Sequence, residues 1–153
     1  MTIVTSSEKE TKQLAKKLVK KHLTSLEKTC LIFALQGELG SGKTQFVKGL
    51  GQALGIKQII HSPTFTLVHE HPFRLSGDQR GVLFHIDAWR LDDPQELVDL
   101  QLNKMIEPGN ILAIEWVDKT KDTLKKITKN KKVKIIKLKF KHLDPRSREI
   151  TVS

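Results

Sequence analysis

The sequence predicts an α/β sandwich with a mostly parallel central sheet and antiparallel strands at its edges. Three observations support this fold class. Continuous apolar runs suited to buried strands alternate with amphipathic helical segments along the chain. A glycine-rich turn joins one of these runs to the helix that follows it. Residues 133–152 then contain two alternating segments, which predict an antiparallel pair along one edge of the sheet.

The length and composition suit one soluble domain covering residues 1–153. The chain is 38% hydrophobic and 29% charged, and 153 residues can bury a proper core. No apolar run approaches the ~20 residues of a membrane span, and the first ten residues lack the apolar segment of a secretory signal. The single cysteine, Cys30, excludes a disulfide framework, and its apolar neighbours predict burial. We therefore expect a cytoplasmic protein without membrane contact.

The net charge of +10 is concentrated at the C-terminal end of the chain. Residues 119–153 contain 13 lysines and arginines against three acids, whereas residues 1–118 contain 14 of each sign. A basic surface of this kind attracts RNA or an acidic protein partner. Lysines on an exposed strand also prevent edge strands from pairing with other chains. A tRNA contact through this basic part is thus one of two open explanations.

The first half of the chain predicts a helix, a buried strand and a second helix. Ser7 and Glu10 have the spacing of a capping box and precede apolar residues at helical intervals, so a helix is expected over about residues 8–22. Residues 29–36 form a continuous apolar run, which is typical of a strand buried on both faces. After the glycine-rich turn, helically spaced apolar residues predict an amphipathic helix that ends at Gly55.

The second half predicts further strands around one more helix. A helix starts at Asp92 or Asp93 with Pro94 in its first turn, and Leu97 and Leu100 mark its inward face. The expected strands cover residues 65–68, 82–86, 111–114, 133–140 and 148–152, with a turn at residues 75–78. This alternation of strands and helices is the pattern of a parallel central sheet.

The glycine-rich turn has the pattern of a P-loop. Its residues, all expected to bind nucleotide, are Gly37, Glu38, Leu39, Gly40, Ser41, Gly42, Lys43 and Thr44. The glycines allow successive backbone N–H groups to point at phosphate oxygens, and the helix that follows adds its N-terminal dipole. Lys43 is expected to reach the β- and γ-phosphates of ATP and the Thr44 hydroxyl to ligate Mg²⁺. This position between a buried strand and an amphipathic helix supports the assignment.

Two carboxylates follow apolar strands and are candidates for the magnesium site. Asp87 ends the segment 82–86 and Glu115 ends the segment 111–114. Both should emerge at the carboxyl edge of the sheet, where ligands bind in open α/β folds. One acid can hold the ion while the other polarises the attacking water, and the sequence does not decide between them. Trp116 either packs near the nucleotide or fills the core.

Four segments, in order and at matching spacing, resemble one family. They are Gly37–Thr44, residues 62–68 (Ser-Pro-Thr-Phe-Thr-Leu-Val), residues 85–91 (His-Ile-Asp-Ala-Trp-Arg-Leu) and residues 114–116 (Ile-Glu-Trp). Together they resemble the TsaE family, bacterial ATPases needed to form the threonylcarbamoyl group on adenosine 37 of tRNA. The resemblance covers about residues 5–118 and extends poorly into the basic end.

The resemblance implies a function and a set of partners. By it, the chain is a magnesium-dependent ATPase that docks onto TsaD, which pairs with TsaB and carries out the threonylcarbamoyl transfer. Hydrolysis would reset that complex between turnovers and would be slow without it. The resemblance also implies that residues 62–68 act as a switch in which Thr64 senses the γ-phosphate or completes the magnesium shell. By itself, Pro63 indicates only an extended entry into a strand.

Some positions depart from the pattern of the family. Trp89 and His71 stand where tyrosine is usual, and Gln101 stands where glycine is frequent. The lysine density of the C-terminal part leaves the residues that contact adenine unassigned. The phosphate and magnesium groups are unaffected by these changes.

Three other functions are alternatives to an ATPase. A small nucleotide or metabolite kinase with a P-loop is the enzymatic alternative, although such kinases carry an arginine-rich lid and this chain has five arginines. A GTPase would need an Asn-Lys-x-Asp guanine reader, and the aspartate is missing after both Asn103-Lys104 and Asn130-Lys131. A non-enzymatic RNA-binding module is the third alternative, drawn from the basic end.

Overall fold

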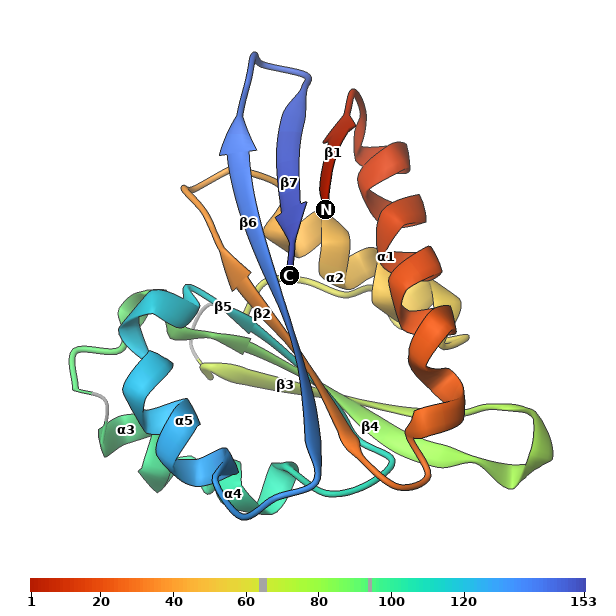
Figure 1. The fold of residues 1–153 in the computed structure, drawn as a ribbon, viewed down its shortest axis with the longest axis vertical. Helices are drawn as coiled ribbons and strands as arrows, with labels where there is room; N and C mark the ends of the chain where they lie inside the picture. Colours follow the sequence, from red (N-terminus) through yellow and green to blue (C-terminus); the bar gives the residue numbers. More distant parts are fainter. Residues whose placement is uncertain (64–65, 94) are drawn as a thin grey trace.

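One sheet runs through the molecule (Figure 1). The computed structural model describes residues 1–63, 66–93 and 95–153. Within these residues the sheet has seven strands in the order β1-β7-β6-β2-β5-β4-β3. Their bounds are β1 Thr2–Thr5, β2 Cys30–Gln36, β3 Val68–Arg74, β4 Arg80–Asp87, β5 Ile111–Glu115, β6 Val133–His142 and β7 Arg148–Val152. The four central strands are parallel and the outer pairs antiparallel, which confirms the predicted fold class.

Helices cover the two faces of the sheet. They are α1 Glu8–His22, α2 Lys43–Ala53, α3 Gln95–Asp99, α4 Leu102–Met105 and α5 Lys121–Thr128, with 3-10 turns η1 Leu23–Ser25, η2 Ser76–Asp78, η3 Ala88–Arg90 and η4 Val117–Lys119. Leu31, Phe33 and Leu35 of β2 pack with α1 and α2 on one face, whereas Cys30 and Ile32 pack with the shorter helices on the other. This alternation is why the run 29–36 is apolar at every position. No helix in the described part of the chain is long and apolar enough to cross a membrane.

Helix α1 begins where the capping box predicts. The Ser7 side chain accepts a hydrogen bond from the Glu10 backbone N–H at 3.2 Å, and the Glu10 carboxylate accepts one from the Ser6 N–H at 2.7 Å. The first bond satisfies one of the backbone donors that a helix start leaves free, and the second ties the residue before the N-cap to the first turn. Leu14 and Leu18 then face the core, and burying each such side chain contributes about 1.5–3 kcal/mol.

Helices α1 and α2 pack closely because α2 carries a glycine at their contact. A Cβ on Gly49 would stand 2.5 Å from the Lys12 carbonyl oxygen and 2.8 Å from the Ala15 Cβ. No side chain fits that space without moving one helix. This contact fixes α2, and therefore the start of α2, against the rest of the molecule.

The predicted strand over residues 65–68 differs from the structure. It instead begins at Val68 and continues through Pro72 to Arg74. Leu67 has a φ of 57°, a left-handed conformation that stops the strand from starting earlier. Proline is tolerated in β3 because β3 is an edge strand, where one side needs no ladder donor. Phe65 lies outside the described residues.

The sequence predicts that the pair β6–β7 forms an edge of the sheet, and this prediction is wrong. β6 pairs with β2 on one side, and β7 pairs with β1 on the other, so the edge is the short N-terminal strand. The segment Thr2–Thr5 was missed because four residues carry too little alternation to be recognised. The helix α5 was also missed, since Leu124 and Thr128 are its only buried residues among many lysines.

Candidate active site

The parallel strands end together at one edge of the sheet. Gln36 ends β2, Asp87 ends β4 and Glu115 ends β5. In the register of the sheet Asp87 lies beside Glu115, and Glu115 lies beside Leu35 of β2. The loop Gly37–Thr44 continues from β2 at this edge, so the two carboxylates lie next to the glycine-rich turn, as the sequence predicts.

The Gly37–Thr44 loop depends on glycine at two positions. Gly37 has a φ of 151°, and a Cβ there would stand 2.7 Å from the Phe140 carbonyl oxygen. Gly42 has a φ of 102° and is the N-cap of α2. A Cβ there would stand 3.1 Å from the Cδ and Nε of Arg148. These conformations strain any L side chain. The loop therefore turns tightly and points the N-terminus of α2 into the space above it.

Lys43 is buried at the base of the loop. Its ammonium donates hydrogen bonds to the carbonyl oxygens of Gly37 and Glu38, both at 2.8 Å. It also lies 4.1 Å from the centre of the Trp116 ring. Burial lowers the pKa of Lys43, while the nearby Glu115 and Asp87 carboxylates act in the opposite direction. A buried ammonium of this kind gains most when an anion joins it.

Thr44 and His85 hold Glu115 from two sides. The Thr44 hydroxyl donates to Glu115 Oε1 at 2.9 Å. The Nε2 of His85 lies 2.8 Å from the same oxygen, and both His85 and Glu115 are buried. Because the carboxylate can only accept, Nε2 carries the proton when Glu115 is ionised. Glu115 is thus fixed in direct contact with the first turn of α2.

Asp87 is held separately from Glu115. Its Oδ2 accepts a hydrogen bond from the Ser62 hydroxyl at 3.0 Å, and its Oδ1 accepts one from the Trp89 N–H at 3.0 Å. The second bond makes Asp87 the N-cap of η3. The helix-cap role and the candidate metal role therefore fall on the same side chain.

Trp116, which lies beside Lys43, packs against a second tryptophan, Trp89. The ring centres of Trp89 and Trp116 are 4.3 Å apart with an angle of 42° between the planes. Trp116 has a φ of 61°, a left-handed conformation that turns the chain sharply after Glu115. Trp116 both lines the cavity beside Lys43 and packs against the core, so the structure agrees with each of the two explanations.

A cavity of about 340 Å³ contains these groups. The loop from Leu39 to Thr44, together with Gln45, forms its floor, and Asp87, Trp89, Glu115 and Trp116 line one wall. Glu8, Ser62 and Arg148 complete the lining. Three buried polar atoms of the lining, Ser41 Oγ, Gln45 Oε1 and Arg148 Nε, find no hydrogen-bond partner within the described residues, and the Ser41 hydroxyl and the Arg148 N–H among them are donors. Donors left in this way suit an anion such as a phosphate group.

Sequence reasoning did not single out Arg148, His85 or Ser62 for this site. His85 could have been found, because a residue two positions before Asp87 shares its face of the strand. Arg148 gave no local signal, since it reaches the loop only through the fold of the β6–β7 hairpin. The predicted switch residue Thr64 lies outside the described residues, so its assignment stays a prediction.

The donor set near the loop fits a magnesium ion. Thr44 supplies a hydroxyl, and Glu115 and Asp87 supply carboxylates. Hard oxygen ligands of these kinds are the ones Mg²⁺ takes in proteins, with water and substrate phosphates completing the shell. The hydrogen bond from Thr44 to Glu115 shows that two of these oxygen groups are in direct contact.

Comparison with known proteins decides the family. The family model described as threonylcarbamoyl adenosine biosynthesis protein TsaE matches residues 5–150. The chain belongs to the TsaE family. Members of this family are required for biosynthesis of the threonylcarbamoyl modification of tRNA.

Several relatives named as the tRNA threonylcarbamoyladenosine biosynthesis protein TsaE are similar to this chain. The Treponema pallidum protein is 34% identical over 122 residues, which are 80% of this chain and 81% of the relative. The Aquifex aeolicus protein is 36% identical over 121 residues, 78% of each. The Bacillus subtilis protein is 38% identical over 85 residues, 56% of this chain, and the matched part spans about half of that relative, 49%.

A solved structure supports the fold. The crystal structure of Bacillus subtilis YdiB matches with a TM-score of 0.63 and 25% identity, and it covers 99% of this chain and 83% of that chain. The likeness extends over the basic C-terminal part, and the family match also continues to residue 150, so the resemblance expected to end near residue 118 reaches further than predicted. The fold is therefore shared over nearly the whole of this chain.

The structure also explains one departure from the TsaE pattern. Gln101 has a φ of 56° and a ψ of 38° between α3 and α4. This left-handed conformation costs a glycine nothing, which accounts for the glycine frequent at this position in the family. His71, where tyrosine is usual, is buried with neither ring nitrogen bonded to a described residue.

Proposed function

We propose that this chain is a magnesium-dependent ATPase that serves the threonylcarbamoylation of adenosine 37 of tRNA, together with the TsaB–TsaD complex. The observation that carries the proposal is the meeting of Lys43, Thr44 and Glu115 at the start of α2, at distances of 2.8–2.9 Å from their partners. These residue types in this place suit binding and hydrolysis of a nucleoside triphosphate.

The phosphates of ATP would occupy the cavity above the loop. The free N–H groups at the start of α2 and the Ser41 hydroxyl would donate to phosphate oxygens. Lys43 would exchange the carbonyl oxygens of Gly37 and Glu38 for phosphate oxygens, which are stronger acceptors. In this way the carbonyl oxygens of Gly37 and Glu38 would hold the buried Lys43 ammonium until the phosphates bind.

The magnesium ion, when bound, would neutralise charge that develops on the phosphate oxygens. Thr44 would hold it directly, and Glu115 and Asp87 are the carboxylates available for the ion and for the attacking water. His85 and Thr44 keep Glu115 oriented, so this carboxylate can accept a proton from water at a fixed place. Water then attacks the γ-phosphorus, and the bond to the bridging oxygen of ADP breaks.

The stated partners and place in the cell rest on the family. Acting on tRNA together with TsaB and TsaD implies a cytoplasmic protein, and the buried thiol of Cys30 agrees with that setting. A protein that times a larger assembly needs little turnover of its own. We therefore expect slow ATP hydrolysis by the isolated chain and faster hydrolysis with its partners.

Two assays test the proposal. Phosphate release from ATP is measured with and without TsaB–TsaD, and a pull-down of TsaB–TsaD by this chain is repeated with ATP, ADP and a non-hydrolysable analogue. We expect stimulated hydrolysis and binding that depends on the nucleotide. Absence of binding under all three conditions contradicts the partnership. Transfer of phosphate to a small acceptor instead of water would establish the kinase alternative.

A further inference from the structure

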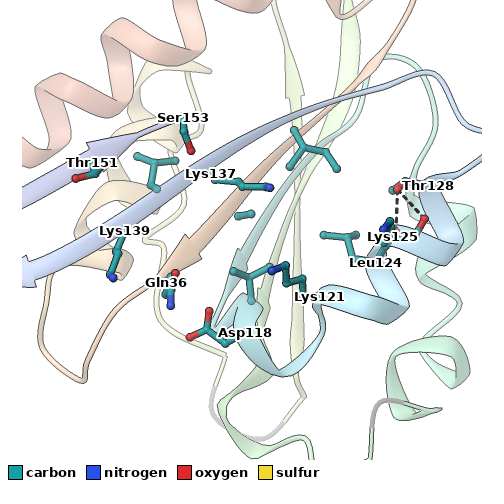
Figure 2. A pocket seen from close by; sticks show the side chains of 14 residues that line it. Gln36, Asp118, Lys121, Leu124, Lys125, Thr128, Lys137, Lys139, Thr151 and Ser153 are labelled. Atoms are coloured by element: carbon teal, nitrogen blue, oxygen red, sulfur yellow. Dashed lines mark hydrogen bonds between the residues drawn. The ribbon is translucent and has the colours of Figure 1, made fainter. Parts of the chain in front are cut away.

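A second hollow lies between α5 and β6, and Gln36 of β2, directly before the Gly37–Thr44 loop, is one of its lining residues. It has a volume of about 710 Å³ and opens on the face of the sheet opposite α1 and α2. Lys121 and Lys125 of α5 and Lys137 and Lys139 of β6 line it, with Asp118 as its one acid (Figure 2). We call this hollow the lysine groove.

The alternation of β6 explains the lysines. Ile136, Leu138 and Phe140 are buried against α1 and α2. The residues between them, Lys137 and Lys139, must then project from the opposite face, and both are exposed. Side chains two residues apart on a strand are separated by about 7 Å, a spacing similar to that of successive phosphates along a nucleic acid strand. β6 thus presents a regular row of cations.

Hydroxyl groups and the charge of the chain support an anionic ligand. Thr151 of β7 lies beside Lys139 in the sheet register, and Ser153 also lines the groove. Hydroxyls next to ammonium groups are common phosphate donors. The whole net charge of +10 arises in residues 119–153, which contain α5, β6 and β7. The groove is therefore a place where a polyanion gains from several cations at once.

The lining favours RNA over an acidic protein. All residues that line the groove lie in the described part of the chain, and none of them is aromatic or an arginine. The centres of protein interfaces depend on such anchors, and base stacking on single strands depends on aromatic rings. Besides apolar side chains such as Val117, Leu124 and Ile135, the lining offers lysines and hydroxyls that suit contact with phosphates, and such contact positions a nucleic acid without reading its sequence.

We propose that the lysine groove binds the sugar–phosphate backbone of RNA. The inference rests on the place of the family in tRNA modification and not on ATP hydrolysis at the loop. A tRNA transcript is therefore the probe. Binding of this kind releases counterions, so the affinity should fall steeply with salt.

The test measures tRNA affinity by fluorescence anisotropy between about 50 and 200 mM KCl, because phosphate contacts lose much of their affinity over this range of salt. If four lysines contact phosphates, log K should fall with log salt at a slope of about −3. Lys137→Gln with Lys139→Gln should reduce that slope by about 1.5 and weaken binding about tenfold or more at the lowest salt.

Two further double variants complete the test. Lys121→Gln with Lys125→Gln removes the same charge from α5 without touching the sheet, and it should weaken tRNA binding similarly, even if the β6 variant folds poorly. Lys17→Gln with Lys20→Gln removes the same charge from the exposed side of α1, across the sheet from the groove. This control should bind tRNA as the unmodified chain does.

Three outcomes overturn the proposal. One is tRNA binding that survives both groove variants, and another is equal weakening by the α1 control, which would reduce the effect to net charge. The third is unchanged tRNA binding with lost affinity for the TsaB–TsaD complex, which would make the groove a protein-docking surface. ATP hydrolysis, measured in parallel, separates these results from any failure of the proposed ATPase function.

Discussion

The two halves of the sheet on either side of β2 differ in cover and in charge. On the side of β5 and β4 both faces are packed: Leu83 and Ile111 face α1 and α2, while Ile86 and Leu112 face the shorter helices. On the side of β6 and β7 only one face is fully packed, and Lys137 and Lys139 project from the other (Figure 2). The Gly37–Thr44 loop lies at the boundary between the two halves.

This difference shows that charged residues act in two different ways on one sheet. In the packed half, Asp87 and Glu115 stand at the ends of buried strands, where low local dielectric strengthens each contact. In the open half, the lysines remain in water, so each contributes little alone and acts only as part of a row. Substitutions in the packed half should therefore have large individual effects, and those in the open half small ones.

The largest expected effect is on hydrolysis at Glu115. Glu115→Gln keeps the shape of the side chain but removes the charge that accepts a proton, so ATP hydrolysis should fall by about 10²–10⁴-fold. Glu70→Gln is the matched control, because Glu70 is an exposed acid on the edge strand β3 and allows the same substitution. Phosphate release in the presence of the partner proteins is the measurement. Normal hydrolysis by the Glu115 variant would remove this residue from the mechanism.

Core packing gives the next contrast. Leu112→Ala in the packed half should lower the free energy of unfolding by about 2–5 kcal/mol, since it leaves a cavity between covered strands. Lys139→Ala in the open half should change it by less than about 0.5 kcal/mol. Urea unfolding followed by circular dichroism measures both. Similar losses at the two positions would mean that the open face is covered in solution.

Lys43 separates function from stability. Lys43→Met should reduce hydrolysis by about 10²–10³-fold, because it removes the cation that meets the phosphates. The same change should leave the free energy of unfolding unchanged or higher, since burial disfavours the ammonium and lowers its pKa. Hydrolysis and urea unfolding of one preparation test both statements. A marked loss of stability would show that the bonds to Gly37 and Glu38 outweigh the cost of burial.

His71 should make the packed half sensitive to acid. Burial, then His85 and His69, lower its pKa below the ordinary 6.5. The unfolded chain therefore takes up this proton first as pH falls, and stability is lost as pH decreases from 6.5 through the lower pKa of the folded protein. His71→Phe should reduce that loss. The free energy of unfolding of the variant, relative to that of the unmodified chain, should therefore be higher at pH ~5 than at pH ~8. An equal difference at both pH values would contradict this origin.

The smallest effect concerns Cys30. Burial raises the pKa of its thiol to about 12, so the thiolate is scarce in the folded protein. In the unfolded chain the thiol ionises near its ordinary pKa of 9.0, so stability should fall as pH rises above 9.0. At neutral pH the consequence is kinetic: a thiol reagent should label Cys30 slowly unless urea is added. Rapid labelling of the folded chain would mean that the strand β2 opens locally.

Local signals in the sequence were enough to predict the elements around the loop. Ser7 and Glu10 mark the start of α1, and the apolar run before Gly37 marks β2, because each signal acts within a few residues. The positions of Asp87 and Glu115 followed from the rule that parallel strands end at one edge. The functional roles of these residues remain predictions.

Other features depend on distant parts of the chain and left no local signal. The left-handed conformations of Leu67 and Trp116 are imposed by packing on side chains that do not favour them. Arg148 reaches the cavity only because the β6–β7 hairpin folds toward the loop. The edge strand β1 is defined by its pairing with β7, which four residues alone cannot indicate.

The tryptophan pair has a spectroscopic consequence. The chain contains two tryptophans and no tyrosine, so its ultraviolet emission comes from Trp89 and Trp116. These rings lie 4.3 Å apart, and Lys43 is 4.1 Å from one of them. Any event that draws the Lys43 ammonium away from the ring changes the surroundings of every strong fluorophore in the molecule. The protein thus contains a built-in optical reporter at the base of the Gly37–Thr44 loop, which needs no added dye.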